Sequence, residues 1–254
     1  AQSRVGTADG FQAISRKSLS EVVTSITGPV TPTTSNSPMK LQCVVKNGSV
    51  YHAYWIIKQS FASPQLVSQT SEDGVSFGAQ TSSTGNTAIS FCCTHRKLSD
   101  GFYYWFVMRP GGGLYAAAGT SPPTAPSGAT TANSLGSLGT EVPHANMACI
   151  IEDGDTGIVV ASMHNVAGTT IKFWRSTPPA IGTPAPVVLG TISEATLGVS
   201  EIYGVDYMID TGSVIEIYVS VLSVTNELKT IKLTQTDRTW ASFDASASTL
   251  DRVY

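Results

Sequence analysis

The sequence predicts an all-β protein, specifically a β-propeller built from four-stranded antiparallel blades. The first observation is an internal period of roughly fifty to sixty residues, which is the range expected for propeller blades. The second is that each repeat has the same order: a strand, an Asx/Gly hairpin, an apolar strand, a loop and an alternating strand. The third is size, because 254 residues with 41% hydrophobic content can bury a substantial core.

Four repeats are visible, and we place them at residues 39–87, 88–145, 146–201 and 202–254. The two termini together could complete a further blade. The sequence therefore leaves four and five blades open.

Residues 1–38 differ from the repeats and predict an N-terminal adaptor segment. Ser18-Leu19-Ser20-Glu21 is a capping-box pattern, and the apolar residues that follow share one helical face until Gly28-Pro29 ends the run. We therefore expect one short helix at about residues 18–27. A Pro/Thr/Ser-rich connector follows from Val30 to Pro38.

In the first two repeats, hairpin signals separate apolar runs that are typical of strands. The strands expected in the first repeat cover residues 40–45, 50–57 and 66–68, with a turn at Asn47-Gly48. Those of the second cover residues 88–93, 102–108 and 114–116, with turns at residues 99–101 and 111–113.

The last two repeats follow the same order. In the third we expect strands at residues 147–151, 158–162 and 171–175, with a turn at residues 153–155. In the fourth we expect strands at residues 205–209, 214–221 and 228–233, with a turn at residues 210–212.

The cysteines support this alignment of the repeats. Cys43, Cys92 and Cys149 fall at the matching place in the first strand of three successive repeats, where a propeller needs small residues around its axis. Cys92 and Cys93 are adjacent on one strand, so their side chains should point to opposite faces. We interpret all four as buried free thiols, which favours a reducing compartment, although a bridge between Cys43 and Cys149 is left open.

An acidic turn, Ser71-Glu72-Asp73-Gly74-Val75-Ser76-Phe77, follows the third strand of the first repeat. Here an Asp carboxylate can accept backbone N–H bonds, Gly can supply a positive φ, and the aromatic side chain can cover the blade edge. Residues 236–240 look like a degenerate copy, and residues 176–179 keep only the position.

This turn resembles the Asp-box of the sialidase-like propellers. The resemblance implies a structural role for Ser71, Asp73, Gly74 and Phe77, away from any ligand. Sialidases of that family hold a carboxylate with three arginines, the first in an Arg-Ile-Pro motif, which this sequence lacks. No catalytic residue is therefore carried over.

Composition excludes several classes of function. The net charge is −3 with 13% charged residues and no run of Lys or Arg, so we expect no nucleic-acid partner. The most apolar run, Val214 to Val224, is too short to span a bilayer, so we expect no membrane insertion. No signal-peptide pattern is visible at the first residues. Nothing in the sequence implies a cofactor.

Few residues suggest chemistry. Asp153 and Asp155 are weak candidates for a Ca²⁺ site, but an Asp-Gly hairpin turn is the better interpretation, so we expect no metal. A glycosidase needs two carboxylates across a sugar, and nothing in the spacing selects a pair from Glu201, Asp206 and Glu216. Glu216 alternates with isoleucines, so it should face solvent or a channel.

Aromatic residues recur on the strands, and most should lie between blades. The candidates for a ligand-binding face are Tyr115, beside the Gly111–Gly113 hairpin, together with Tyr104 and Trp174.

A charge-poor all-β chain rich in Ser, Thr, Gly and Ala, with free thiols, resembles phage or viral virion components such as tail, fibre or capsid-surface proteins. The sequence therefore favours a non-enzymatic virion structural or attachment protein, assembled in the host cytoplasm. Its partners would be other virion proteins or further copies of itself in a homo-oligomer, and host-surface glycan. The alternatives are a secreted, extracellular propeller lectin and a propeller-type glycoside hydrolase.

Overall fold

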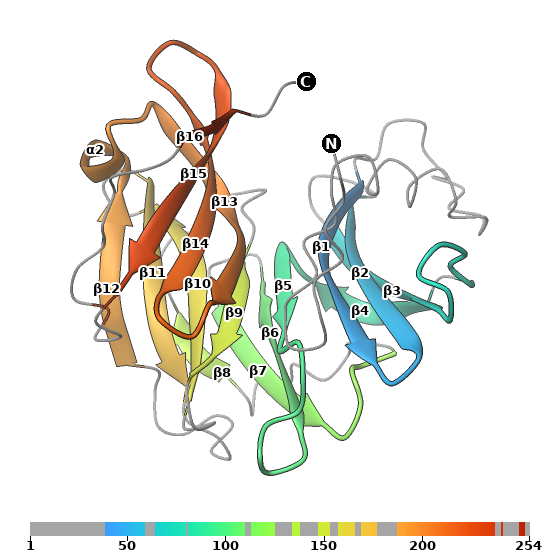
Figure 1. Cartoon of the computed structure of the whole chain (residues 1–254). Coiled ribbons are helices and arrows are strands. Elements are labelled where there is room, and N and C mark those ends of the chain that lie inside the picture. Colours follow the sequence, from blue (N-terminus) through green and yellow to red (C-terminus); the bar gives the residue numbers. More distant parts are fainter. Residues whose placement is uncertain are drawn as a thin grey trace.

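The computed structural model describes residues 39–58, 64–79, 81–109, 113–124, 134–137, 147–152, 157–165, 169–176, 187–236, 240 and 249–251. These residues form four separate four-stranded antiparallel sheets, which follow one another along the chain (Figure 1). In each sheet the strands are ordered as in the sequence, from the first to the fourth. The predicted all-β fold class is confirmed.

Each sheet is one blade, and the strands of the first two are as follows. Blade 1 contains β1 (Met39–Asn47), β2 (Val50–Lys58), β3 (Pro64–Ser71) and β4 (Thr81–Thr87). Blade 2 contains β5 (Ser90–Cys93), β6 (Tyr103–Met108), β7 (Gly113–Gly119) and β8 (Ser134–Ser137).

The second half of the chain repeats the arrangement. Blade 3 contains β9 (Ala148–Ile151), β10 (Ile158–Asn165), β11 (Thr169–Ser176) and β12 (Val187–Ser193). Blade 4 contains β13 (Glu201–Asp210), β14 (Ile215–Leu222), β15 (Leu228–Gln235) and β16 (Thr249–Asp251). A single helical turn, α2 (Glu194–Leu197), connects the two blades and is capped by the Ser193 hydroxyl.

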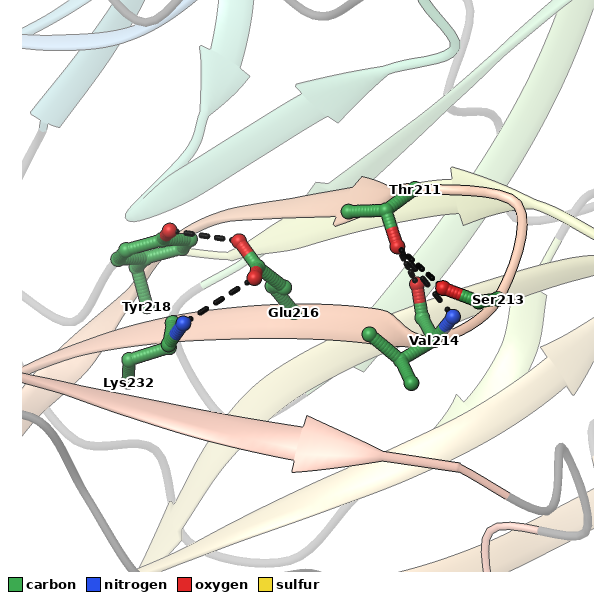
Figure 2. Close-up of polar contacts among 6 residues, drawn as sticks. All are labelled: Thr211, Ser213, Val214, Glu216, Tyr218 and Lys232. Atoms are coloured by element: carbon green, nitrogen blue, oxygen red, sulfur yellow. Dashed lines mark hydrogen bonds and ion pairs between the residues drawn. The ribbon is translucent and has the colours of Figure 1, made fainter.

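Tight turns set the register of the inner hairpins. Gly48 has a φ of 61° between β1 and β2, and Gly212 has a φ of 88° between β13 and β14. The second turn is closed by Thr211, whose hydroxyl donates to the carbonyl of Val214 at 2.9 Å (Figure 2). In addition, Asp210 Oδ1 accepts the backbone N–H of Gly212 at 2.8 Å. Both turns lie where Asn47-Gly48 and Asp210-Thr211-Gly212 predict them.

The blades pack face to face through apolar side chains, which alternate between the two sides of each second strand. On β6, Tyr104, Phe106 and Met108 pack toward blade 3, whereas Tyr103, Trp105 and Val107 pack toward blade 1. One buried cluster therefore lies between blades 1 and 2, another between blades 2 and 3, and a third between blades 3 and 4. At about 25 cal/mol per Å² of apolar area, these interfaces are the main source of stability.

Some predictions need additions or lie outside the described residues. The sequence pattern identified three strands in each repeat, and the structure adds the outer strands β4, β8, β12 and β16, together with α2. The expected helix at residues 18–27, and the blade that the two termini could complete, lie outside the described residues. Among the residues that are described, no helix has the length and apolarity needed to cross a membrane.

Candidate functional site

The first strands of the four blades meet around the propeller axis, where they enclose a small pocket. Each blade contributes to its wall, which consists of Gln42, Cys43, Cys92, Cys93, Met147, Ala148, Cys149, Asp206, Tyr207 and Met208. The cavity volume is about 10 Å³, which is room for one water molecule. Small-molecule sites are usually hundreds of Å³ in volume, so a sugar ring does not fit at this axis.

The cysteines line this pocket as their matching positions in the repeats predicted. Cys43, Cys92 and Cys149 come from β1, β5 and β9, and all three are buried. All four cysteines are free thiols, so the bridge left open between Cys43 and Cys149 is absent. Cys92 and Cys149 instead share a hydrogen bond.

Burial determines the chemistry of these thiols. It raises the pKa values of Cys43, Cys92 and Cys93 well above that of an exposed thiol. The reactive species in cysteine chemistry is the thiolate, which such a site disfavours. Cys43, Cys92 and Cys93 therefore act as small packing residues and are poor nucleophiles.

Asp206 is the one carboxylate in the pocket wall. Its Oδ2 accepts a hydrogen bond from the Ser220 hydroxyl at 2.7 Å. Of the other two sequence candidates, Glu201 is exposed at the start of β13, and Glu216 lies on β14. In the described residues, no second carboxylate reaches the axis from another blade.

Glu216 lies on the face of β14 that is turned away from blade 3, as its alternation with isoleucines predicted. Tyr218 donates to its Oε2 at 2.7 Å, and Lys232 donates to its Oε1 at 3.1 Å (Figure 2). Burial by itself raises the pKa of Glu216, but the Tyr218 and Lys232 hydrogen bonds and the lysine charge outweigh it. The pKa of Glu216 is therefore lowered, and the group is a carboxylate at neutral pH.

The acidic turn between β3 and β4 has the local geometry that its residues predicted. Asp73 Oδ1 accepts the backbone N–H groups of Val75 at 2.8 Å and Ser76 at 2.7 Å, and the Ser71 hydroxyl at 2.7 Å. Gly74 has a φ of 75°. The backbone bonds to Ser76 and Val75 are the main reason that the pKa of Asp73 lies well below its ordinary value.

The aromatic residue that follows this turn, Phe77, is buried with Trp55 and Val67 on the face of blade 1 that is turned away from blade 2. These contacts agree with the structural role predicted for the turn, which stays a prediction. In the degenerate copy, Trp240 is likewise buried and packs against Phe173, with 5.3 Å between ring centroids. Residues 237–239 and 177–179 of the two copies lie outside the described residues.

The three residues proposed for a ligand-binding face are engaged within the protein. Tyr104 is buried and donates to Asp100 Oδ2 at 2.5 Å. Trp174 is buried, and its indole N–H donates to the Ser162 hydroxyl at 3.0 Å.

Tyr115 is partly buried, and the guanidinium of Arg109 lies 4.4 Å from its ring centroid. A ligand-binding role for Tyr104, Trp174 and Tyr115 stays a prediction, and this geometry disfavours it.

Glu152, the acidic residue next to the weak metal candidate Asp153, has a structural role. Glu152 forms a two-point ion pair with Arg175, at 2.7 Å to Nε and 2.6 Å to Nη2, which fastens the end of β11 to the end of β9. The weak metal candidates Asp153 and Asp155 lie outside the described residues. Within the described part of the chain, no group of three or more His, Cys, Asp or Glu side chains is arranged to hold a metal ion.

A second polar cluster lies on β13 and β14. Glu216 was singled out from the sequence, but the cluster was not identified. It includes Tyr207 and Tyr218, whose rings stack across β13 and β14 with 4.3 Å between centroids. The signal was present in the run from Ile215 to Val221, where every second residue is polar or aromatic. In the other three blades, the described residues of the second strand contribute mainly apolar side chains to buried clusters on both faces.

Comparison with known proteins gives a likeness in fold only. No protein-family profile matches the sequence, and no curated protein matches it. Among solved structures, a bifunctional GH43-CE protein of Bacteroides eggerthii aligns with a TM-score of 0.53 and 13% identity over 84% of this chain and 28% of its own.

Two further structures align less closely. One is an α-L-arabinanase of Penicillium chrysogenum complexed with arabinobiose, which aligns with a TM-score of 0.49 and 13% identity over 81% of this chain and 59% of its own. The other is an α-L-arabinofuranosidase of Clostridium thermocellum, which aligns with a TM-score of 0.49 and 16% identity over 80% of this chain and 70% of its own. This chain therefore spans 59% of the arabinanase and about a quarter of the bifunctional protein.

The resemblances to sialidase-like propellers and to virion components rest on the sequence. Proteins of the GH43 type are β-propellers. Together with the four antiparallel blades around one axis, the likeness to the Bacteroides eggerthii protein establishes that this chain has an all-β propeller fold.

Proposed function

We propose that this chain is a non-enzymatic propeller that serves as a binding and assembly module. The observation that carries the proposal is the wall of the axial pocket, which holds four thiols and a single carboxylate, Asp206. Hydrolysis of a glycosidic bond by the usual mechanisms needs two carboxylates on opposite sides of the bond. The pocket is also too small to admit a sugar.

We further propose that the module belongs to a virus particle, as a structural or attachment component. Support comes from the composition: charged residues make up only 13% of the chain, and all four cysteines are free thiols. Rigid blades joined by loops suit a component that contacts neighbouring copies, other virion proteins or a glycan on the host surface. Assembly in the host cytoplasm agrees with unoxidised thiols.

The second candidate function is a propeller-type glycoside hydrolase, and the fold likeness to the GH43-CE protein is what favours it. A fold by itself does not determine function, because one architecture carries many activities. Among the described residues, Asp206 and Glu216 of blade 4 are candidates for the acid and the base of such a hydrolase. Both of these carboxylates already have hydrogen-bond donors within the blade.

A hydrolysis assay separates the two candidates. The purified chain would be incubated with arabinan, xylan and β-glucan, and the release of reducing ends would be compared with that from Asp206→Asn and Glu216→Gln variants. We expect no release above the buffer blank from any of the three proteins. Turnover by the wild type that either substitution abolishes would replace our proposal with the hydrolase.

The virion proposal has its own test. Particles purified from a culture that expresses the chain would be analysed by mass spectrometry for its peptides, at a stoichiometry comparable to known structural proteins. We expect the peptides in the particle fraction. If the protein were abundant in the culture supernatant and absent from the particles, the virion role would be wrong. The conclusion drawn from the hydrolysis assay would not change.

A further inference from the structure

His52 is a titratable side chain inside an apolar interface. It lies on β2, where it alternates with Tyr54 and Ile56, both of which pack toward blade 2. Its partner across β1 is Val45, which belongs to the same buried cluster. The imidazole therefore lies on the side of blade 1 that faces blade 2, where β1 lies beside β5 (Figure 1).

The imidazole of His52 is almost fully buried. The residue is 6% exposed, and within the described part of the chain its Nδ1 has no hydrogen-bond partner. A neutral imidazole has one N–H group, whereas the protonated ring has an N–H group on both nitrogens. Protonation would therefore bury a charge and also leave the Nδ1 donor without an acceptor, and each of these costs free energy.

The surrounding strands offer no carboxylate that could neutralise a protonated His52. No strand of blade 1 or blade 2 contains an Asp or a Glu residue. In the turn after β3, Glu72 is exposed, and Asp73 accepts N–H groups of its own turn. Asp100 accepts the hydroxyl of Tyr104, which packs toward blade 3. A positive charge on His52 would therefore not be compensated by these groups.

The other titratable groups of this interface stay neutral in acid. They are Cys43 of β1, Tyr54 of β2, Cys93 of β5 and Tyr103 of β6. Burial is the largest of the causes that raise the pKa values of these groups, so none of them is an anion at or below neutral pH. From β3, uncharged Thr70 is opposite His52. The loop after β5 adds two exposed cations, Arg96 and Lys97, and Lys97 Nζ lies 5.9 Å from the ring centroid of Tyr103. These positive charges would disfavour a second one.

The sign of the pH effect follows from the burial of His52. Burial lowers its pKa from the ordinary value of 6.5. Below pH 6.5 the unfolded chain therefore binds a proton that the folded chain does not bind. The stability that depends on neutral His52 is complete above pH 6.5 and is lost as the pH falls toward the lower pKa of the folded state. Within that range, each pH unit multiplies the unfolding equilibrium constant by up to about tenfold.

We propose that His52 is a pH-sensitive contact between blades 1 and 2. A proton taken up by its imidazole in mild acid loosens the packing of β1 and β2 on β5, and release of the proton restores it. This device goes beyond the proposed function, because it belongs to the fold and operates whether the module binds a partner or hydrolyses a substrate.

Urea unfolding of the full chain at pH 7.5 and pH 5.0, followed by circular dichroism, tests the proposal. His52→Leu removes the titrating group and keeps an apolar side chain in the cluster. We expect the unfolding equilibrium constant of the wild type to rise between the two pH values by about threefold or more beyond the rise in His52→Leu. The matched control is His95→Leu, at a partly exposed histidine after β5, which should keep the pH dependence of the wild type.

Hydrogen–deuterium exchange of the wild type locates the effect and needs no variant. Exchange at the two pH values, corrected for the chemical exchange rate, reports how readily each strand opens. We expect peptides from β1, β2 and β5 to lose protection at pH 5.0. Peptides from β13 and β14 of blade 4 should keep theirs.

The same pH dependence in the wild type and in His52→Leu overturns the inference. An equal loss of protection in all four blades also overturns it, because acid would then act on the whole protein and not on one interface. If His52→Leu does not fold, the exchange experiment decides alone, and unchanged protection of β1, β2 and β5 at pH 5.0 refutes the proposal.

Discussion

Replacing Phe91 by Ala tests whether the blades are held together by the apolar clusters between them. Phe91 is fully buried on β5, and its ring lies 4.5 Å from that of Tyr54 on blade 1. Truncation of a buried Phe to Ala typically costs about 3 to 5 kcal/mol, which includes the cavity left behind. For a chain of this size, a loss of 1 kcal/mol lowers Tm by about 2 to 4 °C. We therefore expect Tm to fall by roughly 6 to 20 °C.

The measurement is thermal and urea unfolding followed by circular dichroism, with Phe102→Ala as the matched control. Phe102 undergoes the same change in volume but is 39% exposed, so its loss should cost much less than the loss of Phe91. The backbone bond from Phe91 N–H to Gln42 Oε1, at 3.1 Å, is kept in the variant, so the effect reports packing. Equal changes in Tm for the two variants would refute the assignment of Phe91 to an interface between blades.

Three further predictions concern the turns and the thiols. Asp73→Asn should lower Tm, whereas Glu72→Gln, at an exposed neighbouring position, should not. Because folding lowers the pKa of Asp73, the stability that its carboxylate contributes is present above its ordinary pKa of 3.8 and is lost at lower pH. The difference in Tm between the wild type and Asp73→Asn should therefore close in acid. Gly74→Ala should destabilise more than Gly48→Ala: both need a positive φ, but only at position 74 would the new Cβ meet a ring, that of Tyr51 at 3.3 Å. A thiol reagent should label no cysteine in the native protein and four after denaturation, and a count of two would reveal a disulfide.

The inner strands of each blade were predictable because their sequences are short apolar runs bounded by turn residues. The run from Tyr103 to Met108 is continuously apolar and aromatic, and all six residues are buried. Such a run, bounded by a Gly turn at residue 101, is typical of a strand covered on both faces. The matching cysteines then placed these strands in register around the axis, which the pocket wall confirms.

The outer strands could not be predicted in the same way, since they lie at the edge of a sheet. The β4 sequence, Thr81–Thr87, consists of Thr, Ser, Gly and Asn, and β8 is Ser-Leu-Gly-Ser. These residues carry no alternation of apolar and polar side chains, and they form strands because the neighbouring edge offers backbone partners. Their pairing is a tertiary effect that a local pattern does not contain.

The polar side of β14 in blade 4 was partly predictable. The alternation from Ile215 to Val221 indicated a strand with one polar side, and Glu216 was placed on that side correctly. The stacking of Tyr207 on Tyr218 was not predictable, because it depends on the register shift in β13, which no residue type in that stretch requires. Sequence alone therefore located the strand but did not show that its polar residues contact one another.

The two end blades differ in a way that bears on how the propeller is completed. Blade 1 turns an apolar face away from blade 2, in which Trp55, Val67 and Phe77 are buried. Blade 4 turns a charged face away from blade 3, with Glu216 and Lys232. If these two faces packed directly on each other, the ion pair would lose water and meet a mainly apolar surface, at a cost of several kcal/mol. Closure by direct contact is therefore unfavourable, and any fifth blade would need an apolar face toward blade 1 and a polar face toward blade 4.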